Sequence, residues 1–136
     1  MPVAGLVLVS ALAAAVSGPS EKIEQLFRAF NRHDVVSLQA LYSPDAQLTS
    51  SDFCRPRRGV DVTRTYQAIF AAFPDIRDDV ENVLIDGEFA AVRFVSSSNA
   101  PGNPLHLKLM TFFRFKNDWI IEDDTVFDSG GRPCEE

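Results

Sequence analysis

The sequence predicts a single α+β domain in which three helices come first and pack on a curved antiparallel sheet. Its 136 residues suit one domain. Apolar residues recur with the helical period of about 3.6 as far as Pro74, and with a period of about 2 beyond it. Because a curved sheet needs its concave face covered, the helices are expected on that face, in the order ααβαββββ.

Two helices are expected before the first strand. Ser20 would cap the first helix, whose apolar stripe consists of Ile23, Leu26, Phe27 and Phe30. Asp34 would cap the second, whose apolar residues are Val35, Leu38, Leu41 and Tyr42. A third helix is expected from about Asp61 to Phe73, where Pro74 ends it. Its inward residues would be Val62, Tyr66, Ile69, Phe70 and Phe73.

Five strands are expected, at residues 46–50, 76–85, 89–97, 105–115 and 119–127. Residues 43–45 form a turn before the first strand, and the loop at 51–58 is polar and basic. Asp86-Gly87 is typical of a tight hairpin turn that needs a positive φ. Residues 116–118 connect the last two strands, so the second half of the chain reads as a series of hairpins.

Residues 1–17 carry no charged side chain and hold an apolar run from Val3 to Val16. The run is shorter than the roughly 20 residues that span a bilayer, and small residues follow it, as in a secretory signal peptide. This predicts a signal peptide at 1–17 and a domain at 18–136, secreted or periplasmic, with no membrane span after processing. Because the segment lacks a basic side chain at its start, the alternatives are a buried or frayed N-terminal helix of a cytoplasmic protein, or a wrongly assigned start codon.

Several phrases of the sequence resemble the SnoaL-like branch of the nuclear transport factor 2-like superfamily. They are residues 30–34 (FNRHD), 41–46 (LYSPDA), 113–115 (FRF), 119–122 (WIIE) and 127–128 (FD). The resemblance covers roughly residues 20–128. It implies a cone-shaped barrel whose mouth opens into an apolar pocket. Because members of the superfamily include isomerases, cyclases, epoxide hydrolases, dehydratases and non-catalytic binders, the fold does not decide the function.

Strand alternation selects the side chains that would face this pocket. On the strand at 105–115 the more apolar face holds Leu107, Leu109, Thr111 and Phe113. On the last strand Ile121, Asp123, Thr125 and Phe127 share a side, with Trp119 on it nearer the turn. The opposite faces, which include His106, Glu122 and Asp124, would be exposed. The expected pocket walls are Phe27, Phe70, Val92, Leu109, Phe113, Thr125 and Phe127.

Asp123 is the one acid whose register places it among apolar neighbours. Desolvation there would raise its pKa and suit a general base or acid. Tyr66 or Thr111 would then donate a hydrogen bond to a developing oxyanion. The alternative is an Asp123 that is hydrated at the open strand end, or paired to an arginine of the basic loop. Three adjacent acids at 122–124 cannot converge on one metal ion, because neighbouring strand residues point to opposite faces.

The catalytic sets known for the superfamily do not transfer to this chain. The resemblance aligns the tyrosine and two acids of its steroid isomerases with Leu26, Ser50 and Thr111, none of which supplies that chemistry. It aligns the acid of its cyclases and epoxide hydrolases with Thr125, two residues from Asp123 on the same face. Whether the protein is an enzyme is therefore open, and a reaction would take the form of isomerase- or lyase-like acid–base chemistry.

The loop after the first strand carries two further features. Arg55, Arg57 and Arg58 would bind a carboxylate or phosphate of a ligand if they border the pocket mouth, or else balance an acidic surface. Cys54 in this loop and Cys134 in the C-terminal tail are the only two cysteines. Export would allow a disulfide between them, and free thiols are the alternative.

Composition narrows the classes of partner. With 13 Lys+Arg against 19 Asp+Glu, the net charge of -6 argues against nucleic-acid binding. The sequence has no Gly-rich phosphate loop and no His-Glu-x-x-His, so neither a cofactor nor a metal is expected.

The favoured function is binding of a small, mostly apolar molecule, with or without proton transfer. The alternative is a non-catalytic interaction module whose convex sheet face, with Met110, Phe112 and Val126, packs on a partner. A homodimer suits either function.

Overall fold

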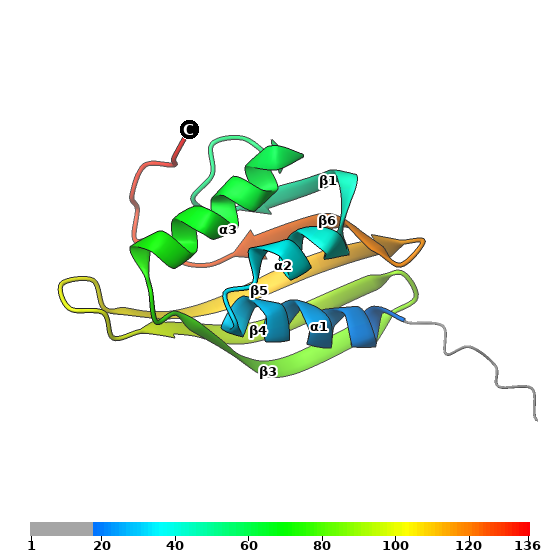
Figure 1. Ribbon diagram of the computed structural model, residues 1–136, viewed down its shortest axis with the longest axis horizontal. Helices are drawn as coiled ribbons and strands as arrows, with labels where there is room; N and C mark the ends of the chain where they lie inside the picture. The colour runs from blue at the N-terminus through cyan, green and yellow to red at the C-terminus, as the bar shows by residue number, and fades with distance from the viewer. Residues whose placement is uncertain (1–17) are drawn as a thin grey trace, which may run out of the picture.

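The computed structural model describes residues 18–136, so the predicted signal peptide at 1–17 lies outside the described residues. Its elements are α1 (Pro19–Asn31), α2 (Val35–Leu41), β1 (Tyr42–Ser50), β2 (Arg57–Arg58), α3 (Val60–Ala72), β3 (Arg77–Asp86), β4 (Phe89–Ser98), β5 (Leu105–Lys116) and β6 (Trp119–Val126). Figure 1 shows one curved sheet with the three helices on the same side of it. The predicted α+β fold class is confirmed. No described helix is long and apolar enough to cross a membrane.

The six strands form one sheet in the order β2-β1-β6-β5-β4-β3. β1 runs parallel to β6, whereas the other neighbouring pairs are antiparallel. The sheet is therefore mixed, and the expectation of a purely antiparallel sheet was wrong. The reason is that the meander from β3 to β6 leaves one edge of β6 free, and the N-terminal strand β1 pairs with that edge. The short strand β2, within the loop expected at 51–58, was also not predicted.

The helices follow the apolar pattern closely. The stripe of Ile23, Leu26, Phe27 and Phe30 on α1 is buried, as predicted. Gly18 caps α1, and the prediction of Ser20 is wrong because Pro19 fits the first helical position, where no N–H is needed. Asp34 caps α2 as predicted, and its carboxylate accepts a 3.1 Å bond from the Ser37 amide. α3 begins and ends one residue earlier than expected.

β1 begins at Tyr42 and not at Ala46, so residues 43–45 belong to the strand. Its pairing with β6 shifts in register between Tyr42 and Gln47. Pro44 lies in this irregular stretch and has no N–H to give to a neighbouring strand. Tyr42, which the helical pattern assigned to the second helix, is instead a buried residue at the start of a strand.

A β-bulge in β6 changes which of its side chains face the helices. The pairing of β5 with β6 shifts between Arg114 and Phe115, which leaves Ile121 as an extra residue. Trp119 is exposed and Ile120 is buried in its place, so the prediction that Trp119 faces inward was wrong. Beyond the bulge the predicted alternation holds, with Asp123 buried between the exposed Glu122 and Asp124.

Candidate functional site

A cavity of about 470 Å³ lies between the helices and the concave face of the sheet. α1, α3 and all six strands contribute to its wall, together with the C-terminal tail. Most of its lining side chains are apolar. Among the sequence-predicted site residues, the structure places Phe27, Tyr66, Leu109, Thr111, Phe113, Asp123, Thr125 and Phe127 in this wall.

Two of the predicted wall residues lie elsewhere. Phe70 does not line the cavity: it lies on the side of α3 that faces the α1–α2 turn, where its ring stacks on His33 at 4.3 Å and packs on Phe30 at 5.1 Å. Val92 does not line it either, because its side chain is fully buried within the packed core. Sequence alternation gave the correct face for Val92, but it does not distinguish the hollow part of that face from the solid part.

Asp123 lies in the cavity wall with only 4% of its surface exposed. The Tyr42 hydroxyl donates a 2.5 Å bond to its Oδ2 atom, and Thr125 donates a 3.2 Å bond to Oδ1. Thr111 in turn lies 2.7 Å from Thr125, hydroxyl to hydroxyl. No arginine among residues 18–136 pairs with Asp123, so the alternative of an arginine-paired carboxylate was wrong.

A second tyrosine extends this network. The Tyr66 and Tyr42 hydroxyl oxygens lie 2.5 Å apart. Because the single proton of Tyr42 is given to Asp123, Tyr66 is the donor in that pair. Burial raises the pKa of both tyrosines well above 10.0, and the nearby Asp123 raises them further. Both phenols therefore stay protonated at neutral pH and act as hydrogen-bond donors.

Burial raises the pKa of Asp123 from 3.8 to about 6, against the lowering effect of the bonds from Tyr42 and Thr125. An ionised carboxylate has about four acceptor positions, and the protein donors named above use two of them. The remaining acceptor positions are open to a bound molecule, because the Asp123 carboxyl borders the cavity. The arrangement can accept a proton from a bound molecule near neutral pH.

The mouth of the cavity is formed partly by the loop after β1 and the C-terminal tail. Cys54 and Cys134 form a disulfide with a Cα–Cα distance of 5.0 Å. Beside it, Phe53 pairs with Glu135 in a short bridge. Residues of both segments line the cavity, namely Asp52, Phe53, Ser129, Arg132, Pro133 and Glu135. The tail is thus fixed covalently beside the mouth.

Of the three loop arginines, the structure brings one to the cavity. Arg57 lines it, donates a 3.0 Å bond to Thr65 and lies 3.6 Å from the centre of the Phe53 ring. Arg55 pairs with Glu136 at 2.6 Å, and Arg58 donates to Gln47 at 2.7 Å, both on the exposed surface. Arg55 thus follows the alternative in which the loop arginines balance acidic groups of the surface, and neither Arg55 nor Arg58 lines the pocket.

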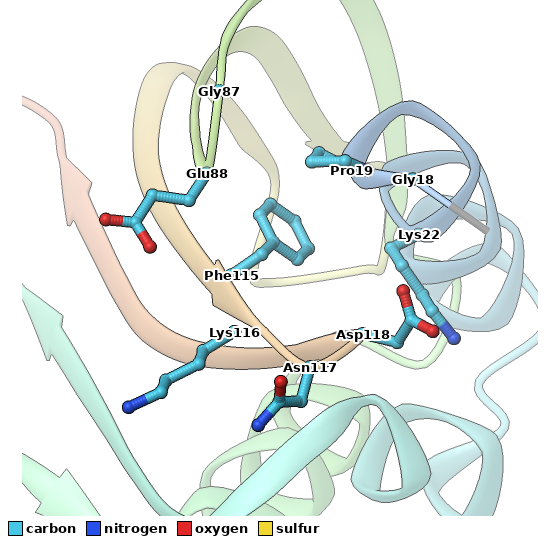
Figure 2. A pocket seen from close by; sticks show the side chains of 9 residues that line it. All are labelled: Gly18, Pro19, Lys22, Gly87, Glu88, Phe115, Lys116, Asn117 and Asp118. Atoms are coloured by element: carbon cyan, nitrogen blue, oxygen red, sulfur yellow. The ribbon is translucent and has the colours of Figure 1, made fainter. Parts of the chain in front are cut away.

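A smaller hollow of about 260 Å³ lies between the start of α1 and the turns that follow β3 and β5; its lining side chains are drawn in Figure 2. Phe115 is its only buried lining residue, and its charged residues carry both signs. It holds no buried polar side chain. Across residues 18–136, no three His, Cys, Asp or Glu side chains are grouped so as to hold a metal ion. The larger cavity is therefore the candidate site.

Two residues of the site were missed from the sequence. Tyr42 was placed on a helix, and no local signal links it to Asp123. Asp78 lies in the cavity wall and is 6% exposed. It shares strand parity with the buried Ile76, so the alternation of the strand expected at 76–85 contained a signal for it.

The sequence itself matches a known family. A model of the SnoaL-like domain matches residues 23–123, which is well over half of the chain. The chain belongs to this family. This confirms the resemblance drawn from residues 20–128, and it makes the cavity the pocket of a SnoaL-like domain. No curated protein sequence matches the chain.

Solved structures share the fold of this SnoaL-like domain. Wild-type IdmH from Streptomyces antibioticus, provisionally assigned as a polyketide cyclase, is 24% identical with a TM-score of 0.76, over 84% of this chain and 94% of IdmH. An NTF2-like protein of unknown function from Burkholderia pseudomallei K96243 is 20% identical with a TM-score of 0.74, over 85% and 94%. A protein with a ketosteroid isomerase-like fold from Catenulispora acidiphila DSM 44928, solved with trimethylamine, is 13% identical with a TM-score of 0.70, over 80% and 85%.

Proposed function

We propose that this SnoaL-like domain binds a small, mostly apolar carbonyl compound in its cavity and transfers a proton from one of its carbons to Asp123. The observation that carries the proposal is the position of Asp123, a buried carboxyl in the wall of an apolar cavity. Its pKa of about 6 leaves it ionised at neutral pH and still basic enough to hold a proton. The provisional assignment of IdmH as a polyketide cyclase supports a ligand of this class.

The proposed step breaks a C–H bond next to the carbonyl group. The proton goes to Asp123, the electron pair of the C–H bond forms a C=C bond, and the carbonyl oxygen takes the negative charge of an enolate. Tyr66 lines the cavity and stays protonated. When the ligand binds, the Tyr66 hydroxyl turns from Tyr42 to that oxygen and donates its hydrogen bond there. Return of the proton from Asp123 to a carbon atom completes an isomerisation or an exchange. Thr111 acts through Thr125, whose hydroxyl it contacts.

A simple ketone tests this step without knowledge of the natural substrate. 4-Acetylbiphenyl is an elongated aromatic methyl ketone, and deuterium wash-in at its methyl group reports enolisation directly. We expect the wild-type protein to accelerate wash-in above the buffer rate. Asp123→Asn removes the base and should lower the protein-dependent rate about 100-fold or more.

Asp124→Asn is the matched control, because Asp124 lies next to Asp123 on β6 but is exposed on the outer face, where it accepts a bond from Thr49. It should retain the wild-type rate. Equal rates for the Asp123→Asn and wild-type proteins would end the assignment of Asp123 as the base.

Export belongs to the proposal as well. The apolar segment at 1–17 has the length of a signal peptide. The disulfide between Cys54 and Cys134 supports an oxidising compartment, where such bonds persist. Expression of the full chain followed by mass measurement of the released protein tests this. Loss of about 17 residues is the expected result, and an intact N-terminus in the cytoplasm would contradict it.

A second function, pairing of two copies through the convex face of the sheet, is favoured by apolar side chains exposed there. Phe112 is 47% exposed and stacks on the neighbouring Phe89 ring at 5.6 Å. Met110 and Val126 face each other across β5 and β6 and are exposed as well. Such a patch is typical of an interaction surface. A dimer of this kind is compatible with the cavity function, since the patch and the cavity lie on opposite faces of the sheet.

Light scattering coupled to size exclusion tests this pairing. We expect a dimer for the wild-type protein and a monomer for Phe112→Lys. Val36→Lys is the control, because Val36 is 80% exposed but lies on α2, away from the sheet. A wild-type monomer at all concentrations tested would contradict the pairing.

A further inference from the structure

Asp78, near the start of β3, is a second buried acid in the wall of the same cavity. The proton-transfer step proposed above does not use it. Burial raises the pKa of Asp78 to about 7, although the bond from Ser96 lowers it, and the neighbouring Asp79 raises it again. Burying a carboxyl costs free energy of folding unless hydrogen bonds offset it, so the burial of Asp78 calls for an explanation.

The backbone around Asp78 is fixed by the turn that ends α1. The Asn31 amide donates a 2.9 Å bond to the Asp78 carbonyl oxygen and accepts a 2.8 Å bond from the Asp78 amide. Two residues earlier, the His33 Nε2 atom lies 2.9 Å from the carbonyl oxygen of Ile76. These contacts hold the start of this edge strand in place. The backbone position of Asp78 is therefore set before any ligand binds.

The carboxyl group of Asp78 has unused hydrogen-bonding capacity. The Ser96 hydroxyl donates to its Oδ1 atom. Among residues 18–136 no other side chain bonds to this carboxyl, and no Lys or Arg forms an ion pair with it. Since Asp78 and Ser96 both line the cavity, the unused hydrogen-bonding positions of the Asp78 carboxyl are available to a ligand in the cavity.

The strand register separates Asp78 from Asp123 along the cavity. Asp78 pairs with Ser96 on β4, and Ser96 pairs with Leu107 on β5. Asp123 pairs with Phe113, also on β5. Leu107 and Phe113 are six residues apart on β5, so the two acids lie at different positions along the strand direction. The two acids thus serve different parts of a bound molecule and do not form one dyad.

We propose that Asp78 and Ser96 form a second polar subsite, which binds a neutral hydroxyl group on the end of the ligand away from Asp123. The inference rests on the proposed function and adds the class of ligand. The ligand is an elongated, mostly apolar molecule with an enolisable carbonyl at one end and an alcohol or phenol at the other.

A hydroxyl fits this subsite better than a charged group. It donates to Asp78 when the carboxyl is ionised and accepts from Asp78 when the carboxyl is protonated, so binding does not depend on one charge state. A ligand carboxylate or phosphate would face a second negative charge once Asp78 is ionised. An ammonium group would have to be desolvated beside an ionised Asp78, and ion pairs formed in buried sites often give no net gain.

Three probes that differ only at the far end test the subsite by calorimetry at pH 7. They are 4-acetyl-4′-hydroxybiphenyl, 4-acetyl-4′-methoxybiphenyl and 4-acetylbiphenyl. We expect the wild-type protein to bind the hydroxyl probe about tenfold or more tightly than either of the others, the worth of one hydrogen bond to a carboxyl. Asp78→Leu, which removes both carboxyl oxygens, should reduce this preference to within twofold of equal binding. Asp79→Asn, on the exposed neighbour, should keep it.

The outcomes separate the two proposals. Equal binding of the hydroxyl and methoxy probes to the wild-type protein overturns the subsite, and so does a preference that persists in Asp78→Leu. The first of these comparisons needs no variant, so it holds even if Asp78→Leu does not fold. A preference for the hydroxyl probe without deuterium wash-in at its methyl group supports the subsite and contradicts the role of Asp123. Binding of none of the probes contradicts both.

Discussion

The Tyr42 hydroxyl donates a 2.5 Å hydrogen bond to Asp123 across 81 residues of sequence. The parallel pairing of β1 with β6 brings these two strands side by side. Tyr42 lies opposite Ile120, three residues before Asp123 on β6, and Leu48 lies opposite Asp123 itself. Two opposing effects meet at the carboxyl: burial raises its pKa, and the bond from Tyr42 lowers it. The result is an acid that titrates near 6 and not near its ordinary 3.8.

Tyr42→Phe should raise the pKa of Asp123 above its wild-type value, because it removes the donor that most strongly stabilises the carboxylate. The pH at which deuterium wash-in reaches half of its plateau should shift upward. Tyr42 is a positioning residue, so the shift of this midpoint tests its role better than a loss of rate.

Tyr66→Phe is the comparison for this prediction. Tyr66 bonds to Tyr42 and not to Asp123, so its removal should lower the rate and leave the midpoint near the wild-type value. Equal midpoints for all three proteins would show that Tyr42 does not influence the titration of Asp123.

Asp123→Asn should make the protein more stable at pH 8. The pKa of Asp123 is higher in the folded state than in an unfolded chain, so folding favours the protonated form. The resulting stabilisation is complete below pH 3.8 and is lost as the pH rises through about 6. At pH 8 the ionised carboxylate costs at most about 3 kcal/mol, and asparagine avoids this cost.

Urea unfolding at pH 4 and pH 8 measures this effect. The free energy of unfolding of Asp123→Asn should exceed that of the wild-type protein by about 1–3 kcal/mol at pH 8, and the difference should shrink toward zero at pH 4. Asp124→Asn should show no such pH-dependent difference, since Asp124 is exposed. Equal effects of Asp123→Asn at the two pH values would contradict the desolvation of this carboxyl.

Apolar periodicity within single helices and strands predicted the features of the fold that depend on one element alone. The stripe on α1 and the alternation of Leu107, Leu109, Thr111 and Phe113 on β5 follow from periods within one element, and the structure has both. The bulge at Ile121 depends on how β6 pairs with β5, and the sequence of β6 alone carries no sign of it. The wrong prediction that Trp119 faces inward follows from this bulge.

The candidate site was predictable to a similar extent. Asp123 was found because alternation places it among apolar residues, whereas its partner Tyr42 required knowledge of a parallel strand pair. Asp78 shares strand parity with Ile76, but this signal was overlooked because charged residues occur on both faces of the strand expected at 76–85. The burial of Asp78 depends on cover from the α1–α2 turn, which lies more than 40 residues earlier in the chain.

Breaking the disulfide should weaken the protein and loosen the cavity mouth. Cys134→Ser frees the tail from Cys54, and the closed loop spans 80 residues, so the chain-entropy model gives a loss of about 4 kcal/mol. Thermal unfolding should show a lower Tm than in the wild-type protein, and the affinity for 4-acetylbiphenyl should fall, because tail residues line the cavity.

The double variant Cys54→Ser/Cys134→Ser controls for the serine substitutions. A reducing agent should lower the Tm of the wild-type protein to that of the double variant and leave the double variant unchanged. Two free thiols in the wild-type protein by mass under non-reducing conditions would contradict the disulfide.

The central claim, that Asp123 is a desolvated base at the surface of a ligand cavity, is tested most directly by nuclear magnetic resonance of its carboxyl carbon. The resonance, assigned by its absence in Asp123→Asn, is followed as a function of pH with and without 4-acetylbiphenyl. We predict a midpoint near 6 in the free protein and a shift of the resonance when the ketone binds. A midpoint near 3.8, or a resonance that does not respond to the bound ketone, would contradict the account.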